Sequence, residues 1–135
     1  EWYNRFPYKY CILFNVCNPL IKIETMEKFI KQYLNTKSEG LFTVFEKKTF
    51  YWDENQKPIT DWEGKRIMHS NTVEPVYEAA HAMYASRMDI IGDDYWMDTS
   101  VPGKPELFIM EELEAFDIDY LWQFEMCEVL YGRKK

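Results

Sequence analysis

A short apolar run near the start of the sequence constrains the fold most strongly. Residues 10–16 read YCILFNV, and the run stops at Asn18 and Pro19. A run of this length with almost no polar interruption is typical of a strand that is buried on both faces, and such strands occur mainly in α/β sheets. We therefore expect an α/β fold that contains this segment as a buried strand.

A helix and a second strand follow this run. Residues 24–35, ETMEKFIKQYLN, alternate apolar and charged side chains at helical spacing, which predicts a helix with one apolar face. The residues NTKSEG end this helix, and residues 41–45, LFTVF, are rich in strand formers. Strand, helix and strand in this order predict a right-handed crossover in a mainly parallel sheet flanked by helices. The apolar face of the helix consists of Met26, Phe29, Ile30, Tyr33 and Leu34.

Four further elements are expected along the rest of the chain. Residues 50–59, FYWDENQKPI, predict a protruding β-hairpin, because two β-forming pieces flank a polar turn. Residues 76–85, VYEAAHAMYA, fit a strand or a helix, and we favour a strand. Residues 106–110, ELFIM, predict a buried strand, and residues 121–131 predict a closing helix. The side chains expected to pack inward from this helix are Leu121, Phe124, Val129 and Leu130.

Length and charge limit the organisation and the partners of the chain. With 135 residues, 47% of them hydrophobic, the chain can bury one core, so we expect a single domain over residues 1–135. The 16 basic and 23 acidic residues give a net charge of −7, which argues against a nucleic-acid partner. A phosphate ligand would therefore need a metal ion.

The cysteines and the hydropathy pattern indicate a cytoplasmic protein. Cys11, Cys17 and Cys127 are odd in number and lack the spacing of a disulfide framework or a zinc site. No apolar run approaches the roughly 20 residues of a membrane span, and no signal peptide is visible, so we expect no membrane association. Because the chain begins at Glu1 without a methionine, we also expect it to be the C-terminal part of a longer protein.

Two aspartates flank one isoleucine before the expected closing helix, in EAFDIDYLW at residues 114–122. In an extended segment alternate side chains share a face, so Asp117 and Asp119 would point the same way, with Cα atoms about 6.6 Å apart after two steps of roughly 3.3 Å. A divalent ion such as Mg²⁺ would relieve their repulsion and keep positions open for phosphate oxygens. The N-terminus of the helix would add backbone N–H groups. The aspartate pair and the start of the helix would therefore suit a metal-bound polyphosphate.

A simpler interpretation of the same pair stays open. Asp119 is an ordinary candidate for capping the helix, and Asp117 could close a turn. Paired aspartates before helices occur without any metal, and on spacing alone this interpretation is the stronger one.

Several segments occur in an order that carries a family resemblance. They are NVCNPLI at 15–21, the FTV strand at 42–44, a hairpin around Trp52 and Asp53, PVYEAAHAMYA at 75–85, and DID before the last helix. Their counterparts are a motif close to QPTSPLR, an FTV strand, a Trp-Asp hairpin, PVYxENGAxYI and DID. This order resembles the C-terminal half of the CMP-sialic acid synthetases (acylneuraminate cytidylyltransferases) and their relatives that activate Kdo and other sugar acids.

The resemblance implies a nucleotidyltransferase with a nucleotide-diphospho-sugar transferase-like, Rossmann-like fold. In this family a hydroxyl of a 2-keto sugar acid attacks the α-phosphate of CTP, giving a CMP-sugar and pyrophosphate. The two DID aspartates of the family bind the catalytic Mg²⁺, which implies that Asp117 and Asp119 are the catalytic and metal-binding residues here. Such a metal neutralises charge on the triphosphate and orients it for in-line displacement. CTP and an acidic sugar are then the expected partners.

The resemblance also implies positions that bind substrate. The glutamine and serine of the family's QPTSP motif fall on Asn15 and Asn18, and a family tyrosine falls on Tyr77. The family's Asn-Gly pair falls on Ala80 and His81, so either His81 replaces the asparagine as a ligand or it is a structural histidine. Aromatic packing explains Tyr77 equally well.

The departures from the family keep other functions open. The glycine-rich, basic nucleotide loop of the family, ARxGSKxxPxKN, has no counterpart here, so we expect the chain alone to bind CTP poorly and to be weakly active or inactive. In the family the hairpin region helps form a homodimer, which implies a dimerisation insert at residues 46–75 with Tyr51 and Trp52 at the interface. The alternatives are a metal-dependent glycosyltransferase that uses an Asp-x-Asp motif, and a non-catalytic homologue that acts as an assembly module.

Overall fold

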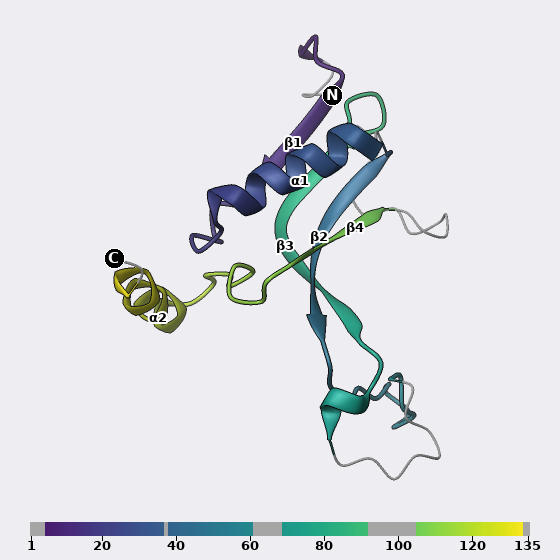
Figure 1. Cartoon of the computed structure of the whole chain (residues 1–135), viewed down its shortest axis with the longest axis vertical. Coiled ribbons are helices and arrows are strands. Elements are labelled where there is room, and N and C mark those ends of the chain that lie inside the picture. The colour runs from purple at the N-terminus through teal and green to yellow at the C-terminus, as the bar shows by residue number, and fades with distance from the viewer. Residues whose placement is uncertain (1–4, 37, 61–68, 92–104, 134–135) are drawn as a thin grey trace.

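The described part of the chain forms a four-stranded sheet with two helices, an α/β arrangement (Figure 1). The computed structural model describes residues 5–36, 38–60, 69–91 and 105–133. The strands and helices that the sequence predicts are confirmed, including the strand favoured for residues 76–85. In chain order the elements are β1 Tyr10–Phe14, α1 Ile23–Thr36, β2 Gly40–Lys47, the 3₁₀ turn η2 Ser70–Thr72, β3 Val76–Arg87, β4 Glu106–Met110 and α2 Leu121–Gly132.

The sheet is mixed, and this corrects the expectation of a mainly parallel sheet. The strand order is β1-β3-β2-β4. β3 pairs antiparallel with both β1 and β2, whereas β4 pairs parallel with β2. β1, β2 and β4 therefore run in one direction, but the long β3 lies between β1 and β2 and separates the two strands that α1 connects. The strand-helix-strand pattern could not reveal this insertion, because β3 comes later in the chain.

The core lies between α1 and one face of the sheet (Figure 1). α1 contributes Phe29 and Tyr33, which are fully buried as its apolar spacing predicts. The ring of Phe29 meets the ring of Phe108 in β4 edge-on, with centroids 5.3 Å apart, and Tyr33 meets Tyr10 in β1 at 5.7 Å. Aromatic side chains thus join the helix to both outer strands, and Leu34 at the end of the predicted apolar face remains exposed.

β1 lies at an edge of the described sheet, where its side chains are only partly covered. Leu13 is 40% exposed and Phe14 is also exposed, so the expectation of a strand buried on both faces is wrong for the part of the chain that the structure describes. The physical reason is the position of β1 in the sheet, since β3 is its only neighbour in the strand order.

α2 stands apart from the sheet and packs far less than predicted (Figure 1). Leu121 is 74% exposed, Phe124 and Val129 are exposed, and Leu130 is partly buried, so the expected inward packing of these side chains is wrong. Cys127 is the buried residue of this helix. In the described ranges, neither helix combines the length and the apolar character that crossing a membrane requires.

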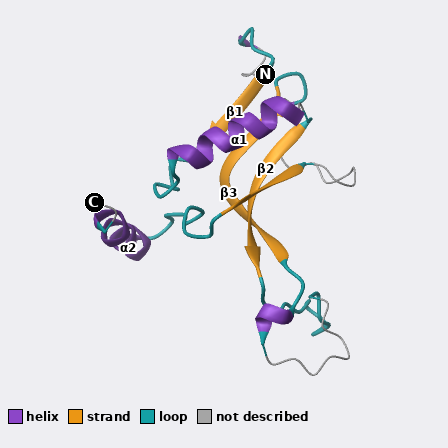
Figure 2. Ribbon diagram, in the orientation of Figure 1, coloured by secondary structure: helices purple, strands orange, loops and turns teal. Residues whose placement is uncertain are grey.

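A tight turn follows β2 within the region predicted as a hairpin. Trp52 and Pro58 form a single antiparallel bridge, and the Asp53 carboxylate accepts hydrogen bonds from the backbone N–H groups of Asn55 (2.9 Å) and Lys57 (2.8 Å). Figure 2 shows the paired β2 and β3 extending beyond β1 and β4 toward this segment. Residues 61–68 of the predicted 46–75 insert lie outside the described residues.

Candidate functional site

The candidate site is built around an irregularity in the pairing of β2 and β3. Phe42 pairs with Tyr84, but Val44 already pairs with Ala79, so Thr43 alone faces the four residues 80–83. The buried Thr43 hydroxyl replaces the lost ladder bonds, because it accepts hydrogen bonds from the N–H groups of Ala82 (3.2 Å) and Met83 (2.9 Å) and lies 3.1 Å from the Met83 carbonyl. This bulge redirects the side chains that follow it.

His81 occupies the bulge in a left-handed backbone conformation with φ of 50°. Its ring Nδ1 lies 2.8 Å from the Tyr84 hydroxyl, and its ring meets Phe42 edge-on at 5.7 Å. The His81 carbonyl accepts a hydrogen bond from the side-chain amide of Asn15 at 3.2 Å. As a residue, His81 is exposed. The bulge thus presents a fixed but accessible histidine beside the end of β1.

Two hydrogen bonds join the segment after β1 to the segment before α2, and a third lies within the segment after β1. The Asn15 side-chain oxygen accepts from the Cys17 N–H (3.1 Å), and the Cys17 carbonyl accepts from the Ile118 N–H (3.0 Å). The Asn18 side-chain amide donates to the Ala115 carbonyl at 3.3 Å. These contacts bring the predicted residues at 15, 18, 81 and 117 into one region, although they are far apart in the sequence.

Asp117 carries one of the buried polar atoms of this region that lack a partner among the described residues. Its Oδ1 is buried and has no hydrogen-bond partner in the described structure. Burial, and then the negative charge of Asp117, raise the pKa of the Tyr84 hydroxyl. Leaving a buried acceptor unpaired costs about 1–3 kcal/mol and more for a charged group, so this oxygen favours a cation.

Asp119 lies on the exposed side of the same segment. The helix begins at Leu121 with Tyr120 as its N-cap residue, so the structure does not support Asp119 as the cap. Instead the Gln123 side-chain oxygen accepts hydrogen bonds from the N–H groups of Asp119 (2.8 Å) and Tyr120 (2.7 Å). This leaves the Asp119 carboxylate accessible at the start of α2.

Mg²⁺ binding by Asp117 and Asp119 stays a prediction. Among the described residues, no group of three or more His, Cys, Asp or Glu side chains is placed to hold a metal ion. Mg²⁺ commonly uses one or two carboxylates and fills its remaining positions with water and substrate phosphates. Asp117, with its Oδ1 that is buried and unpaired in the described structure, and the exposed Asp119 are the two carboxylates predicted as ligands.

An ion pair between the exposed Lys22 and the buried Glu114 anchors the turn that precedes these aspartates. The Lys22 ammonium lies 2.8 Å from Glu114 and 2.9 Å from Glu111, and the Lys22 N–H donates to Glu114 at 3.2 Å. The Glu114 side chain is only 2% exposed. Burial alone would raise the pKa of Glu114, but hydrogen bonds from Lys22 and Thr25 outweigh it and lower the pKa. The segment bearing Asp117 is therefore held against the start of α1.

The other predicted site residues lie away from this cluster. Tyr77 pairs opposite Glu46 in the regular part of β3, before the bulge, and is exposed. The Tyr51 hydroxyl lies 3.5 Å from Glu78, and the exposed Trp52 ring packs near Phe50 with centroids 6.4 Å apart. Their place at a dimer interface stays a prediction.

Gln123 and Tyr84 are among the residues of the site that were not predicted from the sequence. Gln123 stands three positions after the N-cap residue, which is the spacing of a capping box, and that signal could have found it. Tyr84 had no such signal. It follows His81 by three positions, and in a regular strand an odd spacing puts two side chains on opposite faces.

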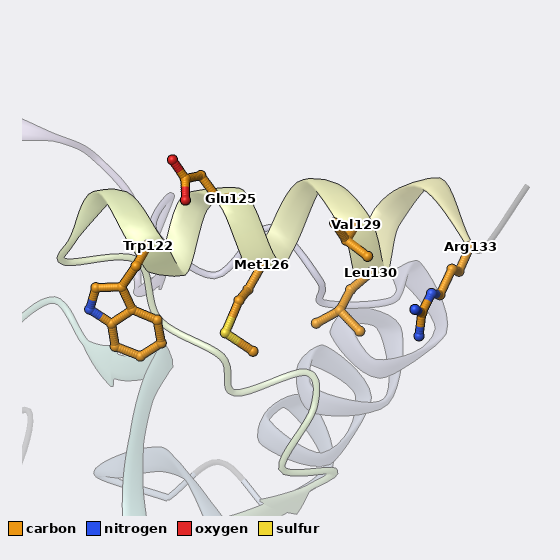
Figure 3. Close-up of a pocket in the computed structure, with 6 residues that line it drawn as sticks. All are labelled: Trp122, Glu125, Met126, Val129, Leu130 and Arg133. Atoms are coloured by element: carbon orange, nitrogen blue, oxygen red, sulfur yellow. The ribbon is translucent and has the colours of Figure 1, made fainter.

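A shallow apolar groove runs along α2 (Figure 3). Its volume is about 530 Å³. In the close-up, Trp122, Met126 and Leu130 project to the same side of the helix, whereas Glu125 points away. None of the predicted site residues lines it. The full lining is Trp122, Glu125, Met126, Val129, Leu130 and Arg133.

Comparison with known proteins does not assign the chain to a family. No protein-family model matches it, and no curated protein gives a significant match.

Proposed function

We propose that this chain is the metal- and sugar-binding part of a Mg²⁺-dependent nucleotidyltransferase that resembles the CMP-sialic acid synthetases. The proposed reaction transfers CMP from CTP to an acidic 2-keto sugar and releases pyrophosphate. The observation that carries the proposal is the buried Oδ1 of Asp117, which has no hydrogen-bond partner in the described structure. A nucleotide-diphospho-sugar transferase-like fold is part of the proposal, supported by the common direction of β1, β2 and β4.

In this proposal Asp117 and Asp119 hold the metal ion. When bound, Mg²⁺ supplies positive charge that offsets the charge of the triphosphate. The exposed side of Asp119 and the start of α2 face the phosphates, where the first N–H groups of the helix favour anions. The turn anchored by Glu114 and Lys22 keeps this segment in place, which reduces the cost of ordering it upon binding.

The polar residues at the end of β1 and in β3 have distinct parts. Asn15 uses both ends of its side-chain amide, toward His81 and Cys17, so it positions the bulge instead of binding substrate directly. Asn18 keeps a buried side-chain oxygen without a partner in the described structure, which a substrate hydroxyl could satisfy. His81 offers an exposed imidazole to the sugar.

A test of this function is the formation of a CMP-sugar. We expect this chain, incubated with Mg²⁺, CTP and either N-acetylneuraminate or Kdo, to form the CMP-sugar and pyrophosphate, slowly because the basic nucleotide loop is lacking. Chromatography of the reaction products measures the CMP-sugar and the pyrophosphate. Absence of CMP-sugar together with absence of Mg²⁺-dependent CTP binding would contradict the proposal.

A role in assembly is the second candidate function. It is favoured by the exposed apolar side chains of α2, which is apolar around most of its circumference. A stable oligomer that neither binds CTP nor makes a CMP-sugar would favour this role. The predicted homodimer contact through Tyr51 and Trp52 is tested in the same measurement of oligomeric state.

A further inference from the structure

The backbone of His81 is unusual for a residue with a side chain. At φ of 50° it adopts the left-handed conformation that glycine reaches without strain and that other residues rarely adopt. Among the described residues, Gln56 is the other non-glycine residue with a positive φ, at 64°, and it lies in a turn. Strained backbone of this kind persists where the surrounding structure fixes it, often at functional sites. The presence of a histidine instead of a glycine at this position therefore needs an explanation.

The ring is held at one nitrogen and open at the other. Within the described part of the chain, its hydrogen bond is between Nδ1 and the Tyr84 hydroxyl at 2.8 Å, and the edge contact with Phe42 fixes the plane of the ring. Because His81 is an exposed residue, its Nε2 can meet a ligand. A partner on one ring nitrogen sets the proton on the other, which is how proteins select the role of a histidine.

Tyr84 is able to hold His81 only because of the bulge. The residues are three apart in β3, and the four residues opposite Thr43 turn both side chains to the same side. The carbonyl of His81 is also fixed, by the side-chain amide of Asn15. Backbone and ring of His81 are thus each held by a separate hydrogen bond.

We propose that Tyr84 is a positioning residue that orients His81 so that its Nε2 hydrogen-bonds the acidic sugar. The class of ligand rests on the proposed function. A polyhydroxylated carboxylic acid offers both hydrogen-bond acceptors and hydroxyl donors to this nitrogen, so it can pair with the ring in either tautomer. His81 then determines which sugar acid binds, and Tyr84 acts through it.

The two histidines of the chain allow a direct measurement. We expect N-acetylneuraminate, added with Mg²⁺ and CTP, to shift the imidazole NMR signals of His81 and to leave those of the exposed His69 unchanged. Kdo serves as a second probe of the same class. Signals of His81 that do not move with either acid would overturn the inference.

Glycine substitution separates a ligand role from a structural role. His81→Gly removes both the ring and the backbone strain, so we expect an equal or higher Tm together with loss of sugar-acid binding. Gln56→Gly is the matched control, because it relieves the same kind of strain in the turn and should leave binding unchanged. Unchanged binding by His81→Gly, or a marked fall in its Tm, would show that the imidazole is structural.

Tyr84→Phe tests the positioning role. It removes the hydroxyl and keeps the ring, and we expect about tenfold weaker sugar-acid binding, the effect of losing one hydrogen bond that orients a ligand group. The Tm and the signals of His69 should stay the same. Binding at full strength by Tyr84→Phe would contradict the positioning role.

The outcomes also separate this inference from the proposed function. If His81 responds to the sugar acid but no CMP-sugar forms, the nucleotidyltransferase function fails and the sugar-acid site stands. If a CMP-sugar forms as fast with His81→Gly as with the unchanged chain, the function stands and the inference fails.

Discussion

α1 and α2 are both rich in apolar residues, yet they are held in different ways. α1 buries Phe29 and Tyr33 completely against the sheet, whereas the buried residue of α2 is Cys127. The segment leading into α2 depends on polar contacts instead, through Glu114 and the carbonyl of Cys17. The proposed site thus lies in the segment before α2, which is positioned by hydrogen bonds and an ion pair and not by apolar packing as α1 is.

The largest expected effect is on the free energy of unfolding, and it tests whether α1 is packed more tightly than α2. Phe29→Ala should lower the free energy of unfolding by about 3–5 kcal/mol, because it removes a buried ring that meets Phe108. Phe124→Ala in α2 removes the same group from an exposed position and should cost less than about 0.5 kcal/mol. Urea unfolding of both variants measures the difference. Equal costs would show that α2 is packed as tightly as α1.

A smaller effect is expected at the bulge. Thr43→Val keeps the shape of the side chain but leaves the N–H groups of Ala82 and Met83 without their acceptor. We expect a loss of about 2 kcal/mol, since unpaired buried donors cost about 1–3 kcal/mol. The exposed Thr72→Val, on the turn η2, is the control and should change stability little. Should Thr43→Val be as stable as the unchanged chain, the hydroxyl does not hold the bulge.

The smallest effect concerns the polar anchor and depends on pH. Glu114 has a lowered pKa, so its stabilising contribution is present above its ordinary value of 4.5 and is lost as the pH falls through the lowered value. Glu114→Gln should therefore cost about 1–2 kcal/mol at neutral pH, where the ion pair with Lys22 is intact. The difference in Tm between this variant and the unchanged chain should shrink below pH 4.5. A difference that is constant with pH would contradict the anchoring role.

Local sequence patterns predicted the elements well, because each depends on neighbouring residues. The spacing of Phe29 and Tyr33 indicates both the helix and its buried face. The burial of β1 and α2 was mispredicted, since apolar composition does not reveal whether another element lies alongside. The insertion of β3 between β1 and β2 is likewise a long-range property.

The site was only partly predictable for a related reason. Asn18 and His81 were predicted from the family resemblance, and Asp117 was predicted from its spacing to Asp119 as well as from the resemblance. The structure brings their segments together through hydrogen bonds. Tyr84 was not, because its contact with His81 exists only through the bulge, and the bulge depends on a hydroxyl in another strand. Regular strand periodicity therefore misplaces the pair.

Magnesium binding to Asp117 tests the central claim most directly. Calorimetric titration with Mg²⁺ in the presence of CTP should show binding that Asp117→Asn weakens by more than about tenfold, while its Tm stays the same because the buried Oδ1 has no hydrogen bond to lose in the described structure. Glu27→Gln on the exposed side of α1 removes one negative charge elsewhere and should bind as the unchanged chain does. Equal Mg²⁺ affinity in both variants would contradict the account.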